Sequence, residues 1–171
     1  NTNNEDVTTT WKNYTSQDGT FSFKYPKEWY ISDIKTDSAY GATMYSWILS
    51  NFTNPQINNG PKDGNIKTEF SVYCDPSRVN RTFENVMAQC NSKPPEDTQR
   101  LECVKIILGG KNYKRVISKF NDGYGGEMKT LSISTHEGQC EYTMASYIPV
   151  GPSEKAGINT LEQISNTFQI K

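Results

Sequence analysis

One stretch of the sequence decides the fold: Asp18-Gly19-Thr20-Phe21-Ser22-Phe23-Lys24-Tyr25-Pro26-Lys27-Glu28-Trp29. The Asp-Gly pair favours a tight turn, because glycine adopts positive φ angles without steric penalty. Every second residue from Phe21 to Tyr25 is aromatic, which is the period of a strand with one buried face. Pro26 has no backbone N–H to donate, so the strand ends there or lies at an edge. The stretch therefore predicts a hairpin that places an aromatic face in the core.

The remaining chain is rich in strand patterns separated by turn residues. Strands are expected at Trp11–Thr15, Phe21–Tyr25, Trp29–Ile34, Met44–Phe52, Ile66–Cys74, Leu101–Leu108, Tyr113–Phe120, Met128–Thr135 and Cys140–Ile148. The last four are joined by short glycine-containing turns, which are too short for crossover connections. They therefore predict an antiparallel meander.

Two helices are predicted from apolar residues that recur with helical spacing. The first is Phe83–Asn91, with Thr82 able to cap its start. The second closes the chain, and Asn159 with Glu162 resembles a capping box. Its apolar face would comprise Ile158, Leu161, Ile164 and Phe168. Strands grouped around two separate helices predict an α+β fold, an antiparallel sheet flanked by helices.

Length and composition predict a single domain with a tether. A chain of 171 residues buries roughly 70% of its unfolded surface. Residues 1–10 are polar and are interpreted as a flexible arm or N-terminal tether, with the domain at residues 11–171. A net charge of −1 argues against nucleic-acid partners. Because no apolar run reaches 18 residues, no membrane span is expected. A lipid anchor or leader removed from a precursor is compatible with this arm.

Four cysteines, Cys74, Cys90, Cys103 and Cys140, lack the C-x-x-C spacing of zinc or thioredoxin-like sites. Buried free thiols are the alternative to disulfides, but an even number favours two disulfides and an extracytoplasmic location: secreted, cell-surface or periplasmic. Strand directions place Cys103 near Cys90, at the end of the first helix. The later reversals bring Cys140 back to Cys74. The predicted pairs are Cys90–Cys103 and Cys74–Cys140.

Residues with catalytic potential are few, and no cofactor or metal is expected. His136-Glu137, near Glu141, could transfer protons or bind a metal, but a solvated turn is the favoured interpretation. The chain has one histidine and no G-x-S-x-G elbow, so a serine hydrolase is not favoured. Other weak candidates are Gly109-Gly110-Lys111 for phosphate, and Glu96-Asp97 or Asp122 with Glu127 for a cation. Hairpin and surface roles are the favoured interpretations for all three.

Three N-x-T sequons begin at Asn13, Asn51 and Asn80. They are glycosylation acceptors if the source organism glycosylates its secreted proteins. Asn51 and Asn80 lie beside predicted loops and are favoured over Asn13, which falls within a strand.

Several segments resemble the PsbP/Mog1-like group, and especially its prokaryotic secreted and lipoprotein relatives. They are Trp11-Lys12-Asn13-Tyr14, Phe21-Ser22-Phe23-Lys24-Tyr25-Pro26-Lys27-Glu28-Trp29, and Leu161-Glu162-Gln163-Ile164-Ser165-Asn166-Thr167-Phe168. The resemblance implies an antiparallel sheet sandwiched between helices. It also implies an adaptor rather than an enzyme, and it carries no catalytic motif onto any residue.

Two functions remain open from the sequence. The first is a non-catalytic extracytoplasmic binding or adaptor module that recognises a protein, another surface partner or a small ligand on the sheet face or loops. The alternative is a structural subunit of a cell-surface assembly, in which the N-terminal arm or an open sheet edge pairs with a neighbour.

Overall fold

The computed structural model describes residues 7–16, 19–32, 35–39, 41–53, 62–121 and 126–170. The helices are α1 (Phe83–Ala88) and α2 (Glu154–Asn166), with 3-10 turns η1 (Val7–Thr10), η2 (Pro76–Arg78) and η3 (Gln89–Asn91). The strands are β1 (Lys12–Thr15), β2 (Phe21–Tyr25), β3 (Tyr30–Ile31), β4 (Lys35–Ala39), β5 (Ala42–Ser50), β6 (Lys67–Cys74), β7 (Thr98–Leu108), β8 (Lys111–Asn121), β9 (Glu127–Glu137), β10 (Cys140–Pro149) and β11 (Gln169–Ile170).

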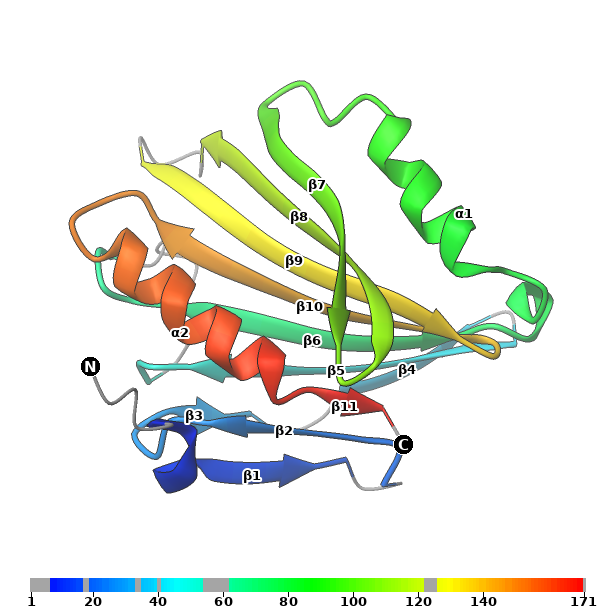
Figure 1. Ribbon diagram of the computed structural model, residues 1–171, viewed down its shortest axis with the longest axis horizontal. Coiled ribbons are helices and arrows are strands. Elements are labelled where there is room, and N and C mark those ends of the chain that lie inside the picture. The colour runs from blue at the N-terminus through cyan, green and yellow to red at the C-terminus, as the bar shows by residue number, and fades with distance from the viewer. Residues whose placement is uncertain are drawn as a thin grey trace.

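These strands form two antiparallel sheets. The small sheet has the order β1-β2-β11, and Figure 1 shows it as a separate layer below the large one. The large sheet has eight strands in the order β3-β5-β6-β10-β9-β8-β7, with β4 also paired to β5. The α+β class and the β7-to-β10 meander are confirmed. The predicted strand Phe21–Tyr25 belongs to the small sheet and not to the sheet of the meander, because β2 pairs with β1 and with the two-residue β11.

The predicted hairpin forms between β1 and β2. Thr15 lies opposite Ser22, and Gly19 donates its N–H to the carbonyl of Ser16 at 2.8 Å. Gly19 has a φ of 72°, a conformation that glycine adopts at little cost. The turn residues 17–18 lie outside the described part of the chain.

Aromatic rings join the two sheets. Phe23 is 2% exposed and stacks on Phe70 of β6 with ring centroids 4.4 Å apart. Phe21 stacks on Trp47 of β5 at 4.8 Å, and Trp47 stacks on Phe70 at 5.6 Å. Large rings bury much apolar area each, so this cluster supplies much of the folding free energy. The aromatic face of β2 is therefore the core contact between the layers.

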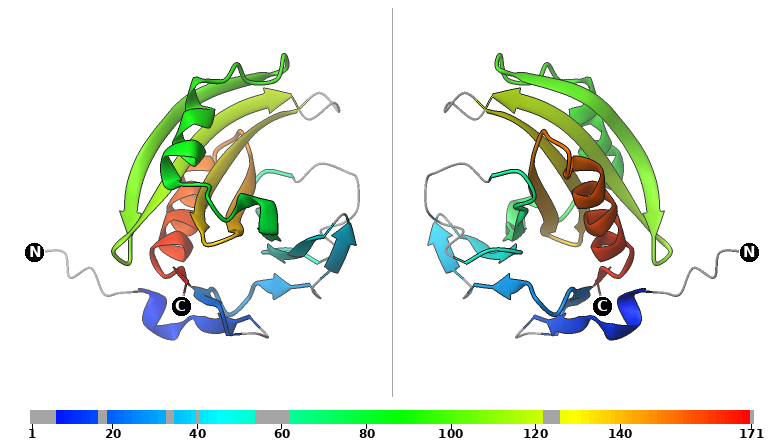
Figure 2. Two further views of the ribbon diagram at one scale, coloured as in Figure 1. Left: turned by 90° about the vertical axis from the view of Figure 1, so that its right-hand side faces the viewer. Right: turned by 90° about the vertical axis from the view of Figure 1, so that its left-hand side faces the viewer.

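Helix α2 covers the same face of the large sheet, and Figure 2 shows strands β7 to β10 curving around it. Leu161 and Ile164 of α2 are fully buried against the sheet. A Cβ at Gly157 would lie 3.2 Å from a methyl of Ile148, so glycine permits the close approach of helix and sheet. The predicted capping box at Asn159 is wrong: α2 begins at Glu154 after Ser153. The first turn of α2 has no large apolar residue, so the apolar spacing in the sequence marks the helix only from Ile158 onward.

Helix α1 lies on the opposite face of the large sheet. Lys114 and Arg115 are neighbours in β8, and Lys114 bonds to Gln89, just after α1, while Arg115 bonds to Glu162 of α2 at 2.5 Å. Thr82 is the N-cap, as predicted, and its N–H bonds to the Asn85 side chain at 2.8 Å. The helix is shorter than predicted, because its last turn becomes η3. In the described residues, no helix is long and apolar enough to cross a bilayer.

Two predictions near the N-terminus differ from the structure or are only partly covered by the described residues. The strand predicted at Trp29–Ile34 is shorter, because β3 covers Tyr30–Ile31, and β4 then pairs with another part of β5. Of the arm predicted at residues 1–10, the described part is η1, in which Thr8 is 9% exposed. The arm and the domain boundary at residue 11 remain predictions.

Burial of Tyr113 should make stability fall at high pH. Desolvation raises the pKa of Tyr113 to about 12 from 10.0, with smaller contributions from Glu137 and Tyr142. Between these values the unfolded state has released the phenol proton while the folded state retains it. Stability therefore falls as pH rises through this range. Urea unfolding at pH about 10 and about 11 should show this fall in the native sequence and a smaller fall in Tyr113→Phe. An equal fall in both proteins would contradict the assignment.

Candidate binding face

The face of the large sheet opposite α2 is called the open face. Its side chains follow from the strand register, because directly paired residues point to the same side. One cross-strand row is Ser46, Ser71, Thr143, Ser134 and Lys114, and the next is Ile48, Glu69, Ala145, Ser132 and Val116. Serine and threonine dominate the first row, whereas the second combines Ala145 and Ser132 with Ile48, Glu69 and Val116. The first row gives this part of the sheet a low floor, with the half-exposed hydroxyl groups of Ser46, Ser71 and Thr143 within reach of a partner.

Helices cover the two faces unequally. On the α2 side, Phe70 and Val72 of β6 and Tyr142 and Met144 of β10 are buried. On the open face, the alternate residues of both strands remain half-exposed. Helix α1 packs against β8 and β9. The β5 and β6 part of this face therefore carries no helix in the described ranges.

One end of the floor carries an aromatic and charged group. Lys67 forms an ion pair with Glu69 at 2.6 Å, and its ammonium lies 5.8 Å from the ring centre of Tyr147. The Tyr147 hydroxyl donates to Glu69 at 3.3 Å. Burial, and then the charge of Glu69, raise the pKa of Tyr147, so this phenol is a hydrogen-bond donor at neutral pH.

The other end carries an arginine clamp, defined as Arg78, Arg81 and Glu141. The carboxylate of Glu141 accepts from Arg81 at 2.6 Å and from Arg78 at 3.4 Å. The guanidinium of Arg78 also lies 4.5 Å from the ring centre of Tyr73, a cation–π contact. Six residues along β6 separate Tyr73 from Lys67, about 20 Å at strand spacing. The floor is thus bounded at each end by a tyrosine ring with a cationic side chain beside it.

The turn η2 positions the clamp. Asp75 caps η2 by accepting from the Ser77 backbone N–H at 2.9 Å and from the Ser77 hydroxyl at 2.7 Å. These bonds, the hydroxyl first, lower the pKa of Asp75, and Arg78 contributes further. Asp75 remains ionised at neutral pH and holds Arg78 at 3.4 Å.

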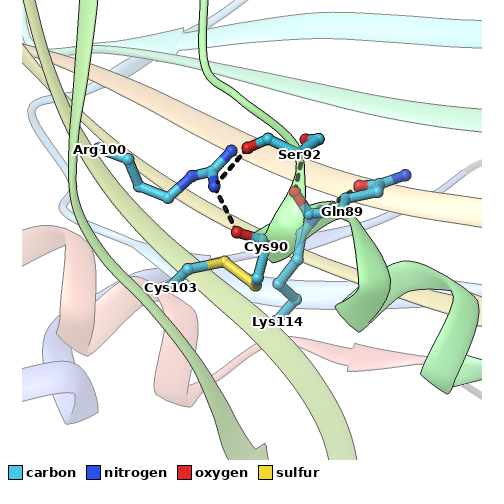
Figure 3. Close-up of a disulfide and its surroundings, with 6 residues drawn as sticks. All are labelled: Gln89, Cys90, Ser92, Arg100, Cys103 and Lys114. Atoms are coloured by element: carbon cyan, nitrogen blue, oxygen red, sulfur yellow. Dashed lines mark hydrogen bonds between the residues drawn. A yellow bond between two sulfur atoms is a disulfide. The ribbon is translucent and has the colours of Figure 1, made fainter.

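A second polar group anchors the end of α1 to the open face. Figure 3 shows Arg100 reaching the carbonyls of Cys90 and Ser92, at 2.5 and 2.9 Å, beside the disulfide of Cys90. Lys114 is 8% exposed and bonds to the side chain of Gln89. Burial lowers the pKa of Lys114; Glu141 opposes this shift and the arginines at 81 and 100 add to it. The clamp and this anchor make the α1 side of the open face rich in positive charge.

Two disulfides fix the segment that carries the clamp. Cys74 is bonded to Cys140, its direct neighbour across β6 and β10, and Cys90 is bonded to Cys103. These are the pairs expected from the strand directions. Non-reducing peptide mapping should recover both cross-links, and a Cys74–Cys90 peptide would contradict this topology.

The predicted catalytic candidates do not assemble into a reactive group in the described residues. His136 lies opposite Glu141 on the open face, but its Nε2 is 3.2 Å from the Arg78 carbonyl while Glu141 bonds to the arginines. His136 Nδ1 and Ser134 Oγ are buried without a protein partner in the described part. No cluster of three or more His, Cys, Asp or Glu suited to a metal occurs there.

The other candidates lie in surface turns. Gly109 and Gly110 form the β7–β8 turn, and Lys111 pairs with Glu137 at 3.0 Å. Glu96 and Asp97 are exposed in the loop before β7. Asp122 lies outside the described residues, and Glu127 pairs with Lys119 at 2.6 Å.

The three sequons differ in their surroundings. Asn13 and Asn80 are exposed. The Asn51 side chain donates to the Gly64 carbonyl at 2.7 Å and accepts from Ile66 N–H at 2.8 Å. These bonds use the amide that glycosylation would modify. Glycosylation of all three remains a prediction, and Asn13 and Asn80 are the more accessible acceptors.

Sequence reasoning missed the clamp and the anchor. Arg81 and Glu141 are 60 positions apart, and Lys114 and Gln89 are 25 apart, so no local pattern connects them. The local signal was Asp75-Pro76-Ser77, a capped turn before a helix.

Neutralising Glu141 should destabilise the fold. Its side chain is 17% exposed and that of Arg81 is 19% exposed, so Glu141→Gln leaves two guanidinium groups with a neutral acceptor. We expect a loss of about 1–2 kcal/mol in urea unfolding, as for a charge-assisted hydrogen bond. The control is Glu137→Gln, because Glu137 is 55% exposed beside Lys111 and should change stability little. Equal effects of the two variants would contradict the clamp's role.

Comparisons with known proteins complete the description of the fold. No protein-family model and no curated protein sequence matches the chain. Cyanobacterial PsbP (CyanoP) of Synechocystis has a TM-score of 0.61 at 13% identity, over 94% of this chain and 92% of its own. LpqN, involved in cell envelope biogenesis of Mycobacterium tuberculosis, has a TM-score of 0.57 at 13% identity, over 95% and 92%.

A Bacteroides thetaiotaomicron protein has a TM-score of 0.57 at 15% identity over 94% of this chain. The chain spans only 48% of the length of that protein. At these identities the likeness is one of fold. The chain has the PsbP/Mog1-like fold that its Trp11, Phe21–Trp29 and Leu161–Phe168 segments predict.

Proposed function

We propose that this protein is a non-catalytic binding module that works outside the cytoplasm and holds a protein partner on its open face. The observation that carries the proposal is the uncovered part of that face over β5 and β6. There Ser46, Ser71, Ile48 and Glu69 form a half-exposed floor, bounded by Tyr147 with Lys67 at one end and by Tyr73 with Arg78 at the other.

The chemistry of this surface favours a macromolecular partner. Tyrosine and arginine are enriched where proteins bind one another, since they combine apolar area with hydrogen bonding. A floor about 20 Å long between two such groups accommodates a protein segment rather than a small molecule. The polar floor supplies hydrogen bonds to the partner along its length.

The location proposed is extracytoplasmic. Two disulfides in a chain of this size support an oxidising compartment, because the cytosol keeps thiols reduced. LpqN, which has the same fold, is involved in cell envelope biogenesis. The tether proposed at residues 1–10 would hold the module at a surface, either through a lipid or through a preceding segment.

The test is capture of a partner by immobilised protein from the extracytoplasmic fraction of the source cells. Ser71→Trp places a large ring at the centre of the floor, and because Ser71 is half-exposed the fold should tolerate it. We expect this variant to recover about tenfold less partner than the native sequence, equivalent to about 1.4 kcal/mol.

The matched control is Asn159→Trp, which adds the same ring to an exposed position of α2. Its recovery of partner should equal that of the native protein. The proposal fails if nothing binds specifically to the native protein, or if both variants retain the partner equally.

A further inference from the structure

Strand β7 is the edge of the large sheet, and its outer side is unpaired in the described residues. It has 11 residues and pairs only with β8. Figure 2 shows it at the outer margin of the molecule. An edge of this length presents a row of backbone N–H and C=O groups that can bond to another strand.

Exposed apolar side chains are concentrated on this edge. Leu101 is 46% exposed, Val104 is 39% exposed and Ile107 is 67% exposed. At the opposite margin, β3 has the sequence Tyr-Ile and β4 has the polar sequence Lys-Thr-Asp-Ser-Ala. Polar residues are a common protection of sheet edges against association, and from Val104 to Leu108 the only polar residue of β7 is Lys105.

Two features of β7 oppose pairing with another strand, but one is directed away from the edge and the other affects only the start of the strand. The ammonium of Lys105 lies 5.8 Å from the ring centre of Phe83, so it is drawn toward α1 rather than extended across the edge. The register shift between Arg100 and Glu102 distorts only the start of the strand. From Glu102 to Leu108 the edge is regular.

The regular part of β7, from Glu102 to Leu108, can pair with a second copy of itself. In an antiparallel pair centred on Val104, that residue faces its own counterpart across a two-fold axis. Cys103 then faces Lys105, and Glu102 faces Ile106. Facing residues in this regular part are both odd-numbered or both even-numbered, so each pair points to the same side of the joined sheet, as strand alternation requires. Leu101 is the extra residue of the bulge and lies outside this alternation.

The neighbouring registers fit less well. Centring the pair on Lys105 places two ammonium groups opposite each other, which is destabilising. Centring it on Cys103 places Val104 opposite Glu102 and Lys105 opposite Leu101. Of these three registers, the one on Val104 places an exposed hydrophobic residue against its own counterpart and opposes no like charges.

We propose that two copies of this chain pair through β7 in this register, forming a two-fold dimer with one continuous antiparallel sheet. A two-fold axis closes the association, so the pairing ends at two copies and no open edge of β7 remains. This inference rests on β7 alone and is independent of the open face and its partner.

The test is the mass of the full chain by sedimentation equilibrium over a dilution series. We expect a reversible dimer of twice 19.4 kDa. Val104→Lys places two charges on the axis and should raise the dimer dissociation constant roughly thirtyfold, as for loss of a central interface residue. Val79→Lys is the control, because Val79 is 60% exposed outside β7 and should leave the constant unchanged. A monomer at every concentration overturns the proposal, as does a Val104→Lys dimer of native strength.

Cross-linking tests the register. Val104→Cys brings two thiols face to face on the axis, within the reach of a disulfide. Ile107→Cys leaves the two thiols about 20 Å apart in the proposed register. Mild oxidation should therefore give a covalent dimer with Val104→Cys and none with Ile107→Cys. The reverse result would overturn the register. Loss of partner capture with the dimer intact would count against the proposed function only.

Discussion

Removing the disulfide between Cys74 and Cys140 should lower the free energy of unfolding by about 4 kcal/mol. The two cysteines are 66 positions apart, so the bridge closes a long loop in the unfolded chain and reduces its conformational entropy. The Cys90–Cys103 bridge spans 13 positions and should contribute less, about 3 kcal/mol. Strands β6 and β10 remain paired without the bridge, so the loss falls on stability rather than on topology.

Urea unfolding under non-reducing conditions measures this difference. One double variant carries Cys74→Ala and Cys140→Ala. The other carries Cys90→Ala and Cys103→Ala, so each removes two cysteines and one disulfide. The loss of stability should be larger for the first pair of substitutions. A larger loss from the second pair would show that α1 and its anchor, rather than the strand pairing, dominate stability.

Replacing Phe23 with alanine should cost about 3–5 kcal/mol, as for other buried aromatic residues. Its ring stacks on Phe70 in the large sheet and lies 5.0 Å from Tyr14 in the small one. The alanine leaves a cavity where the two layers meet, and helix α2 on the same side limits how far they can collapse into it. The loss therefore exceeds the transfer free energy of the ring alone.

Two further variants make this prediction specific to the layer contact. Phe23→Leu keeps most of the volume and should cost less than half as much, so it remains measurable if the alanine variant does not fold. Ser22→Ala changes the neighbouring residue on the half-exposed side of β2 and should have little effect. Equal losses at Phe23 and Ser22 would contradict the assignment of the aromatic face to the core.

The sequence predicted those parts of the fold that depend on local chemistry. The alternation in Phe21–Tyr25, the turn at Gly19 and the meander turns at Gly109-Gly110 and Gly138 each constrain the backbone directly, and each appears in the structure. The errors occur where the signal is short or absent. The two-residue β11 shows no period, and the first turn of α2 has no apolar repeat to mark its start.

The candidate site depends on pairings that are not local. The floor of the open face exists because β6 pairs with β10. Strand directions predicted that Cys140 returns to Cys74, 66 positions away, but no local pattern fixes the register of the other strands across this face. Arg78 and Arg81 meet Glu141 only through this arrangement. His136 and Glu141 were singled out as chemical candidates. The structure instead places Glu141 in an ion pair and His136 against a backbone carbonyl.

The most direct test of the central claim is photocrosslinking from the open face. A photoreactive amino acid placed at Ser71 lies at the centre of the floor, and the same residue at Asn159 lies on the exposed side of α2. Irradiated in the extracytoplasmic fraction of the source cells, the Ser71 probe should give one adduct of defined mass, and the Asn159 probe should not. The same adducts from both positions, or none from Ser71, would contradict binding at the open face.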